Sequence, residues 1–324
     1  MKKILIDVLG CDNPDAVIDG LALALSEVKD VTLIACGDKP RIEERLNDKD
    51  FDRSRLEFID APDEITNNDK SVNAVLMKKN SSLIVALNTL KNAKDIPVMI
   101  TAGSTGALIA GSILILGRNK PDDRATLITH FPTDKGGMAV LADCGANVDC
   151  GPEHLLKFAR YANEYVKKVY GVENPKIGLL ANGTEDSKGN ALTQSAFKLL
   201  KEDTSLNFVG NMEAKTTISG DYDVIVSDGF SGNVLLKSIE GTAVSVIKRA
   251  MECFKQSIKS QEEMKTVKKA FGLLLSQLDF NSTGGSVLLG VRKPVIKAHG
   301  SANSNTVVHT VKQALHMIEC GFAK

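Results

Sequence analysis

The stretch KILIDVLGCDNPDAVIDGLALALSEVKDVTLIAC, residues 3–36, decides the fold. Its first apolar run, 3–8, predicts a buried strand, and its last, 31–36, predicts a second one. Residues 14–28 between them repeat apolar side chains at helical spacing, after a helix start at Asn13. A strand, a helix and another strand in this order are typical of parallel strands joined by a crossover helix. We therefore expect an α/β protein.

The same alternation continues along the chain. Further strands are predicted at 56–60, 97–101, 125–130, 138–143, 176–181, 206–210 and 223–227, with helices between most of them. The sequence therefore predicts a mostly parallel sheet with helices on both faces. A length of 324 residues allows one or two domains, and no linker or repeat divides them. We expect a single domain over residues 1–324.

One segment departs from the alternation of strands and helices. Residues 232–279 read as two long amphipathic helices broken near 260–264, which predicts a helical hairpin. Between 248 and 270 there are seven basic residues against three acidic ones. This basic excess fits a solvated helix face better than a contact with an anionic surface, although both stay open.

Composition excludes several classes of protein. Lysine plus arginine and aspartate plus glutamate both number 40, so the chain lacks the basic excess of a nucleic-acid binder. The longest nearly apolar run, 107–117, is shorter than the roughly 20 residues that cross a bilayer. The first residues, MKKILIDV, lack the apolar core of a secretion signal, and the six cysteines form no CxxC pair. We expect a cytoplasmic protein that binds neither nucleic acid nor metal.

Four glycine-rich turns lie where a predicted strand meets a helix. Ligands of open α/β sheets bind at the carboxyl ends of strands, and free backbone N–H groups at helix starts bind anions. We therefore take the polar residues of these turns as candidate substrate-binding residues. They are Asp7, Gly10 and Asp12 in DVLGCDN (7–13), Ser104, Thr105 and Gly106 in TAGSTGALIAG (101–111), Asn182, Lys188, Gly189 and Asn190 in GLLANGTEDSKGNAL (178–192), and Asp228, Ser231, Gly232 and Asn233 in VIVSDGFSGNVLLK (224–237).

Two interpretations of these residues stay open. The 101–111 turn fits a phosphate cradle, or an ordinary capped helix packed through small residues. Lys188, just before a helix start, fits an anion ligand or a surface lysine. His299 in KAHGSANS (297–304) lies in a polar turn, which suits acid–base chemistry or a structural role. The first turn has a single glycine and is not the GxGxxG fingerprint of dinucleotide binding.

The sequence shows no nucleophile motif. A GxSxG elbow is missing, and Cys144 and Cys150 fit small buried thiols better than reactive ones. The candidate residues that remain are backbone N–H groups, hydroxyls and amides, with one lysine and one histidine. Such a set suits phosphate binding and the stabilisation of an oxyanion.

These motifs, in this order, resemble the phosphate acyltransferases of bacterial phospholipid synthesis, the PlsX family. The resemblance covers nearly the whole chain and rests on DVLGCDN (7–13), KKNSS (78–82), TAGSTGAL (101–108), DCGANVDC (143–150), GNALTQSAFKLL (189–200), NFVGNMEA (207–214), SDGFSGNVLLKSIEG (227–241), GGSVLLGV (284–291) and IKAHGS (296–301). It implies a homodimer with a fold like those of isopropylmalate dehydrogenase and phosphotransacetylase. It also implies conversion of acyl-[acyl-carrier protein] and inorganic phosphate into acyl phosphate, with no cofactor.

The resemblance and the residues together suggest roles. Phosphate is itself a nucleophile, so the protein only has to hold it beside the thioester and stabilise the oxyanion. We expect Lys188 and Asn233 to be catalytic residues that contact phosphate or the oxyanion, and residues 104–106 to line a phosphate cradle. His299 is expected to position or protonate the reacting groups.

Three other functions remain as alternatives to this one. A close alternative is transfer from short acyl thioesters, as phosphotransacetylases perform it. A dehydrogenase is disfavoured by the missing dinucleotide fingerprint, and a non-catalytic scaffold predicts no acyl phosphate at all. The resemblance also implies an apolar hairpin tip that meets the membrane, but SQEEMKTV (260–267) carries two glutamates there. We expect only weak peripheral contact with the inner face of the membrane, or with a membrane acyltransferase, through the nearby lysines and FGLLL (271–275).

Overall fold

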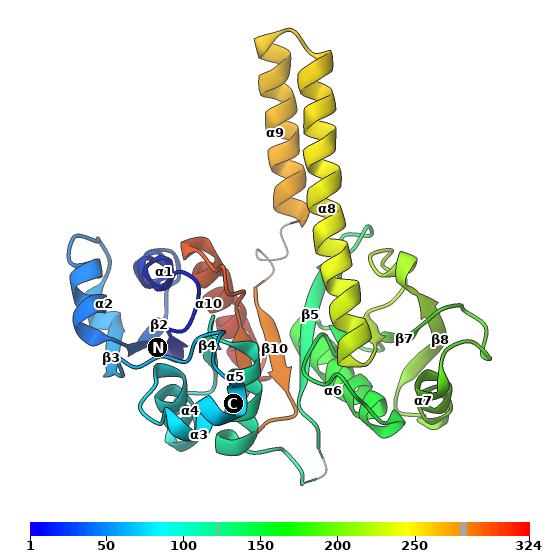
Figure 1. Cartoon of the computed structure of the whole chain (residues 1–324), viewed down its shortest axis with the longest axis horizontal. Helices are drawn as coiled ribbons and strands as arrows, with labels where there is room; N and C mark the ends of the chain where they lie inside the picture. Colours follow the sequence, from blue (N-terminus) through cyan, green and yellow to red (C-terminus); the bar gives the residue numbers. More distant parts are fainter. Residues whose placement is uncertain (122, 279–283) are drawn as a thin grey trace.

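The computed structural model describes residues 1–121, 123–278 and 284–324. Within them, eleven strands form one continuous sheet (Figure 1). In their order across the sheet, they are β3 (Leu56–Asp60), β2 (Val31–Gly37), β1 (Lys2–Asp7), β4 (Met99–Thr101), β11 (Val295–Lys297), β10 (Ser286–Leu289), β5 (Thr126–Pro132), β6 (Met138–Ala142), β9 (Val224–Val226), β7 (Lys176–Ala181) and β8 (Asn207–Glu213).

Most neighbouring strands are parallel, as the sequence predicted. The antiparallel pairs lie in the middle of the sheet, where β10 opposes both β11 and β5, and β5 opposes β6. All nine predicted strands are present, whereas β10 and β11 were missed. Both are only three or four residues long, and no helix separates them, so they do not show the alternation of strands and helices from which short strands such as β4 were predicted.

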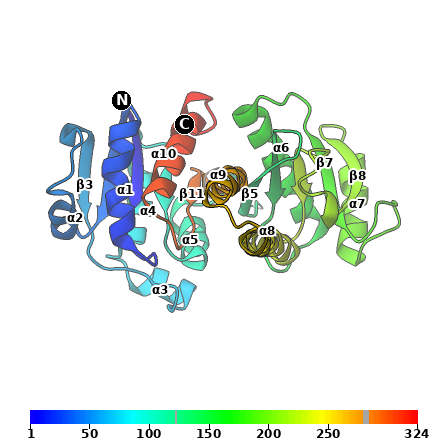
Figure 2. The same cartoon turned by 90° about the horizontal axis from the view of Figure 1, so that it is seen from above.

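Helices cover both faces of the sheet (Figure 2). Buried side chains of α1, α6, α7 and α10 pack on one face, and those of α4, α5 and the start of α8 on the other. The helices are α1 (Pro14–Glu27), α2 (Lys39–Leu46), α3 (Ser71–Met77), α4 (Ser82–Asn92), α5 (Thr105–Gly111), α6 (Pro152–Tyr170), α7 (Ala191–Glu202), α8 (Gly229–Ser257), α9 (Gln261–Leu278) and α10 (Ser304–Glu319).

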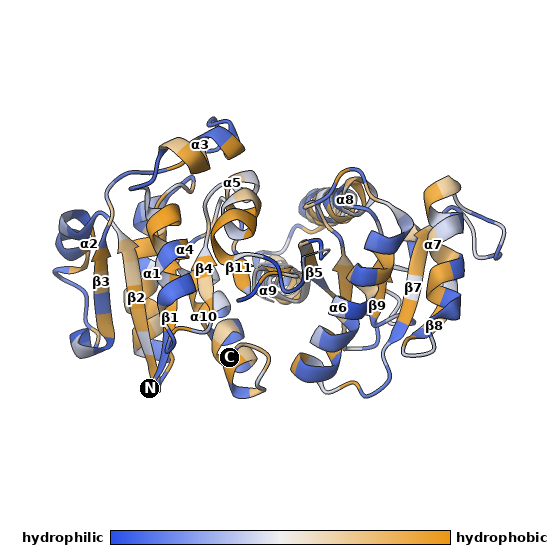
Figure 3. Ribbon diagram, turned by 90° about the horizontal axis from the view of Figure 1, so that it is seen from below, coloured by the Kyte–Doolittle hydropathy of each residue, from blue (hydrophilic) through white to orange (hydrophobic). Residues whose placement is uncertain are grey.

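The core consists of two apolar clusters, one on each face of the sheet. In β1, Ile4 and Ile6 belong to one cluster and Leu5 to the other, because side chains alternate along a strand. All seven residues of β2 are buried, as expected of a parallel strand covered on both faces. Figure 3 shows the resulting hydrophobic strands between more polar helices.

The predicted hairpin is formed by α8 and α9, which project together away from the sheet (Figure 1). The break falls at 258–260, just before the predicted 260–264, and residue 279, its predicted end, lies outside the described residues. Helix α8 begins before the predicted residue 232 because Oδ1 of Asp228 accepts a 2.8 Å hydrogen bond from the N–H of Ser231 and caps it. Of the helices described, none combines the length and apolar content needed to cross a bilayer.

Candidate active site

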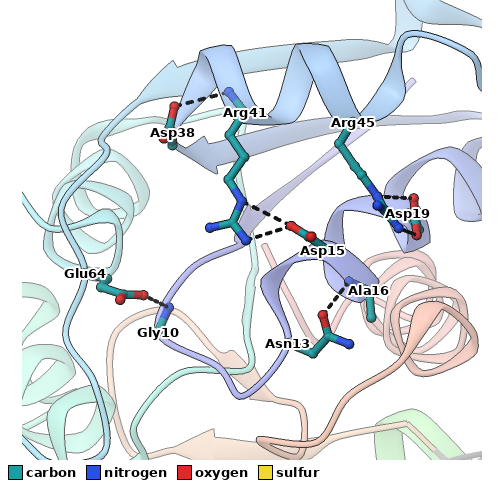
Figure 4. A network of polar contacts seen from close by, with 9 residues as sticks. All are labelled: Gly10, Asn13, Asp15, Ala16, Asp19, Asp38, Arg41, Arg45 and Glu64. Carbon is teal, nitrogen blue, oxygen red and sulfur yellow. Dashed lines mark hydrogen bonds and ion pairs between the residues drawn. The ribbon is translucent and has the colours of Figure 1, made fainter.

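The first glycine-rich turn follows β1 and depends on Gly10. This residue has a φ of +74°, and its N–H donates a 3.3 Å hydrogen bond to Oε2 of Glu64 (Figure 4). A Cβ at this position would lie 2.6 Å from the backbone oxygen of Ile65. Asn13 Oδ1 then accepts a 3.2 Å hydrogen bond from the N–H of Ala16, which starts α1. The turn is therefore a tight structural unit that aims Asp12 toward the middle of the molecule.

Asp7, at the end of β1, is buried beneath this turn. Its Oδ2 accepts a 2.8 Å hydrogen bond from Oγ1 of Thr101, and its Oδ1 accepts one of 3.4 Å from the N–H of Leu9. Oγ1 of Thr101 in turn accepts a 3.0 Å hydrogen bond from the N–H of Gly103. Burial raises the pKa of Asp7 to about 6, against the opposing effect of these hydrogen bonds. The residue ties the ends of β1 and β4 together.

Lys297, at the end of β11, pairs with Thr101 of β4 and is only 8% exposed. Its Nζ donates hydrogen bonds to the backbone oxygens of Ala102, at 3.2 Å, and Ala298, at 2.5 Å. Burial lowers the pKa of Lys297 to about 8, while the negative charges of Asp12 and Asp7 oppose this shift. A buried cation therefore stands at the carboxyl end of the sheet.

His299 follows two residues later and is exposed. Its Nδ1 lies 2.7 Å from Oγ of Ser301 and accepts a 3.3 Å hydrogen bond from the N–H of Ser301. The neutral ring therefore carries its proton on Nε2. Partial burial lowers the pKa of His299, and the positive charge of Lys237 lowers it further. The imidazole is neutral at pH 7.

The start of α8 approaches the loop that follows β6 very closely. A Cβ on Gly232 would lie 1.9 Å from the backbone oxygen of Asp143, so a glycine is required there. The buried carboxylate of Asp143 organises this loop by accepting hydrogen bonds from the N–H groups of Leu127 (3.0 Å) and Asn147 (2.7 Å). Gly145 is thereby held opposite the side chain of Asn233.

These elements enclose a cavity of about 480 Å³, which we call the central cleft. Four sequence-predicted residues line it: Asp12, Thr105, Asn233 and His299. The other lining residues are Asn67, Gly103, Leu127, Thr129, Cys144, Gly145, Leu236, Lys237, Glu240, Gly284, Gly285, Ser286, Lys297, Ala298 and Gly300. The cleft thus brings together polar groups from both halves of the sheet.

A second cleft of about 620 Å³ lies on the other side of α8. Five predicted residues line it: Asn182, Gly189, Asn190, Asp228 and Ser231. Its remaining lining is largely apolar and consists of Leu180, Ala181, Thr193, Ala214, Phe230, Val234, Leu235 and Ser238. Helix α8 therefore divides the predicted site residues between two clefts, because residues one or two positions apart point to different sides of a helix.

The remaining predicted residues line neither cleft. Lys188 is exposed, and its Nζ lies 4.0 Å from Oε1 of Glu185. Ser104 is buried at the start of α5 and makes no side-chain cap, and Gly106 packs closely against the side chain of Ser71. Of the predicted phosphate cradle, only Thr105 reaches the central cleft.

The cysteines near the site are held as thiols. Burial raises the pKa of Cys144, which lines the central cleft, far above its usual range, and raises that of Cys150 to about 11. A raised pKa disfavours the thiolate, which is the nucleophilic form of cysteine. Across the part of the chain that the structure describes, no group of three or more His, Cys, Asp or Glu residues is placed to hold a metal ion.

Comparison with known proteins decides the family. Residues 2–324 match the family model described as fatty acid synthesis protein. A phosphate acyltransferase of Clostridioides difficile (strain 630) is 42% identical over 97% of this chain and 92% of its own length. The chain belongs to the phosphate acyltransferase family. The resemblance inferred from the sequence motifs is thereby confirmed.

Solved structures confirm the fold expected of a phosphate acyltransferase family member. A branched-chain phosphotransacylase from Enterococcus faecalis V583 superposes with a TM-score of 0.63 over 98% of this chain and 99% of its own, at 14% identity. A phosphotransacetylase from Staphylococcus aureus gives 0.61 over 100% and 94%, at 17% identity. The phosphotransacetylase-like fold predicted from the sequence is therefore correct.

Two cations of the central cleft, Lys237 and Lys297, were missed by the sequence analysis. Lys297 stands in the quoted motif IKAHGS, directly after the apolar residues Val295 and Ile296. A lysine that ends a buried strand and precedes a polar turn was the available signal. Lys237 gave no comparable signal, because lysines are common on exposed helix faces.

Proposed function

We propose that this member of the phosphate acyltransferase family transfers the acyl group of acyl-[acyl-carrier protein] to inorganic phosphate, giving acyl phosphate for phospholipid synthesis. The central cleft supports this proposal, because it gathers amide, hydroxyl and imidazole groups and a buried lysine at the carboxyl edge of the sheet. Such groups hold a phosphate dianion and stabilise an oxyanion without a cofactor. The family membership supports the same chemistry.

In the proposed reaction, a phosphate oxygen attacks the thioester carbonyl directly. Asn233, on α8, and Thr105, on α5, face the cleft from opposite sides and bind phosphate or the oxyanion. His299 positions the reacting groups through Nε2–H. Holding both substrates in one cleft turns a bimolecular attack into an intramolecular one, which is a large part of such catalysis.

The decisive experiment is the trapping of acyl phosphate with hydroxylamine after incubation with acyl-carrier thioester and phosphate. We expect hydroxamate that depends on both substrates, and a rate about a hundredfold lower in Asn233→Ala. Asn88→Ala, on α4 and outside both clefts, is the matched control and should keep the wild-type rate. A chain that forms no hydroxamate would be the non-catalytic homologue considered above.

The role of Lys188 is a separate proposal, since its ammonium lines neither cleft. If it contacts phosphate or the oxyanion during turnover, Lys188→Ala should lower the rate about a hundredfold. Lys201, which pairs with Asp186 at 2.8 Å in the same region, gives the control Lys201→Ala. A Lys188→Ala rate within about threefold of the wild type would remove Lys188 from the mechanism.

Short acyl thioesters are the alternative donors. The fold shared with phosphotransacylases supports this alternative function. A panel of donors from about two to sixteen carbons separates the two, because each buried CH₂ contributes about 0.8 kcal/mol to long-chain preference. A rate that peaks with the shortest donor would favour the alternative.

We also propose that the chain works as a homodimer in the cytoplasm. Helix α8 exposes the apolar side chains of Val244, Val246 and Phe254, which supports a contact with a second copy. Light scattering across a range of protein concentrations measures the mass. A monomer mass throughout would refute the dimer.

A further inference from the structure

The two lysines of the central cleft differ in their partners. Nζ of Lys237 forms an ion pair of 2.7 Å with Glu240, and its side chain is half exposed. Lys297 is 8% exposed, and the hydrogen bonds of its Nζ to described residues go to the backbone oxygens of Ala102 and Ala298. Lys297 is therefore held by neutral acceptors rather than by a carboxylate.

This arrangement leaves the ammonium of Lys297 with capacity for a ligand. An ammonium has three N–H groups, and two of them point to carbonyl oxygens. Lys297 lines the cleft, and among the residues that the structure describes no third acceptor binds its Nζ, so the third N–H can meet a molecule bound there. The ammonium is fixed in place by β11 and by its two acceptors, which suits a group that must meet a reacting atom.

The proposed reaction requires a proton at the leaving group. When the carbon–sulfur bond of the thioester breaks, the sulfur leaves as a thiolate, whose conjugate thiol has a pKa of about 8.5, and an acid positioned beside the sulfur assists this step by protonating it. Phosphate enters as HPO₄²⁻ and leaves as part of a dianionic acyl phosphate, so its proton must be passed to sulfur. A group in the cleft that can release and recover one proton completes this balance.

We propose that Lys297 is the catalytic acid of the central cleft and donates a proton from Nζ to the thioester sulfur. This inference rests on the proposed acyl transfer. The phosphate oxygen bonds to the carbonyl carbon, the carbon–sulfur bond breaks, and the sulfur takes the proton of Lys297. The neutral amine then recovers the proton that HPO₄²⁻ carried, and no other reactant is needed.

The protonation states of the cleft agree with this role. Burial lowers the pKa of Lys297 to about 8, close to that of a thiol, so proton transfer between them is nearly balanced. His299 has a lowered pKa and is neutral at pH 7, which makes it a weak acid there. The titratable groups that face Lys297 are the carboxyl groups of Asp7 and Asp12 and the thiol of Cys11 from the β1 side, and the ammonium of Lys237 from α8.

The test compares two donors that carry the same acyl chain. One is the carrier thioester, and the other is an aryl thioester whose thiolate leaves without a proton. We expect Lys297→Met to lower the rate about a hundredfold with the carrier thioester and less than about tenfold with the aryl thioester. Lys297→Arg should behave in the same way, because a guanidinium keeps its charge but does not release its proton.

Lys293→Met is the matched control. Nζ of Lys293 donates to the backbone oxygens of Leu90, Ala93 and Ile96, and Lys293 lines neither cleft. It should keep the wild-type preference between donors, and thermal unfolding confirms that each variant is folded. The inference would be overturned if the rates of Lys297→Met and Lys297→Arg fell equally with both donors, or fell by less than about threefold. The proposed acyl transfer would then still stand. A wild-type chain that forms no acyl phosphate from either donor would refute both.

Discussion

Thr101 Oγ1 donates a 2.8 Å hydrogen bond to Oδ2 of Asp7, and the same two residues pair across β4 and β1. Thr101 also pairs with Lys297 on its other side, in β11. The carboxyl ends of three neighbouring strands therefore place a buried acid, a hydroxyl and a buried cation in one row. Burial raises the pKa of Asp7, so the protonation of this acid changes the stability of the folded chain with pH.

Asp7→Asn tests the burial of this acid. Burial raises the pKa of Asp7 from 3.8 to about 6, so the folded chain binds this proton more tightly than the unfolded chain. The stability that protonated Asp7 contributes is present below pH 4 and is lost as the pH rises to about 6. Asparagine mimics the protonated form. Relative to the wild type, Asp7→Asn should therefore gain up to about 3 kcal/mol between pH 4 and pH 7.

Denaturant unfolding at both pH values measures this difference. Asp60→Asn is the control, since Asp60 also ends a strand, β3, but is exposed. It should not share the stability gain of Asp7→Asn, because the carboxyl group that it replaces is not buried. If the effect of Asp7→Asn on stability were independent of pH, burial would not raise the pKa of Asp7.

His299 should titrate below pH 6.5 and respond to its neighbour on α8. The positive charge of Lys237 contributes to the lowered pKa of His299, and Glu240 acts in the opposite direction. Lys237→Met removes the cation and frees Glu240 from its ion pair, so the pKa of His299 should rise. NMR titration of the imidazole carbons, assigned with His299→Gln, measures it directly.

Lys248→Met provides the comparison for this titration. It removes a positive charge from the same helix but farther along the projecting hairpin. At a physiological salt concentration, charges separated by more than about 8 Å are largely screened, so His299 should not respond. A pKa that rises equally in both variants would mean that the net charge of the protein, rather than the nearby charge of Lys237, controls the pKa of His299.

The sequence predicted most of the sheet because its strands are buried and mostly alternate with helices. It missed β10 and β11. It therefore did not show that β11 places Lys297 beside β4 at the carboxyl edge of the sheet. It also placed Asn190 and Asn233 in one site, whereas they line different clefts. Glycine-rich turns show that residues end near one sheet edge. Which side of α8 each residue occupies depends on the packing of α8, and this is not evident from a strand–turn–helix pattern.

Gly10→Ala tests the tight first turn. A Cβ there would meet the backbone oxygen of Ile65 at 2.6 Å, and the φ of +74° adds strain. We expect a loss of at least about 2 kcal/mol, the sum of a left-handed alanine and a backbone displacement. Thermal and denaturant unfolding measure it.

Gly136→Ala separates the two causes of this loss. Gly136 has a similar φ of +79°, but a Cβ there would have no described heavy atom within 4 Å. It should lose only about 1 kcal/mol, from conformation alone. If both variants lost the same free energy of unfolding, the contact with Ile65 would not contribute to the loss in Gly10→Ala.

The helical hairpin should bind membranes only weakly. Glu262 and Glu263 are exposed beside its tip, and glutamate opposes insertion. Leu273, 60% exposed, lies twelve residues along α9 from its start, which is about 18 Å away from the tip. Phe271 packs against Phe254 of α8 with ring centroids 5.5 Å apart, and the side chain of Leu275 lies outside the described residues. The apolar residues are therefore poorly placed for insertion at the tip.

Co-sedimentation with anionic liposomes tests this expectation. The wild type should bind weakly and dissociate at high salt, because the nearby lysines supply most of the attraction. Glu262→Leu/Glu263→Leu should bind more tightly and resist salt, since apolar side chains then lie at the tip. Glu173→Leu/Glu202→Leu makes the same change at exposed positions away from the hairpin and should bind like the wild type. Wild-type binding as tight as that of a lipid-anchored protein at physiological salt would show that the hairpin inserts despite its glutamates.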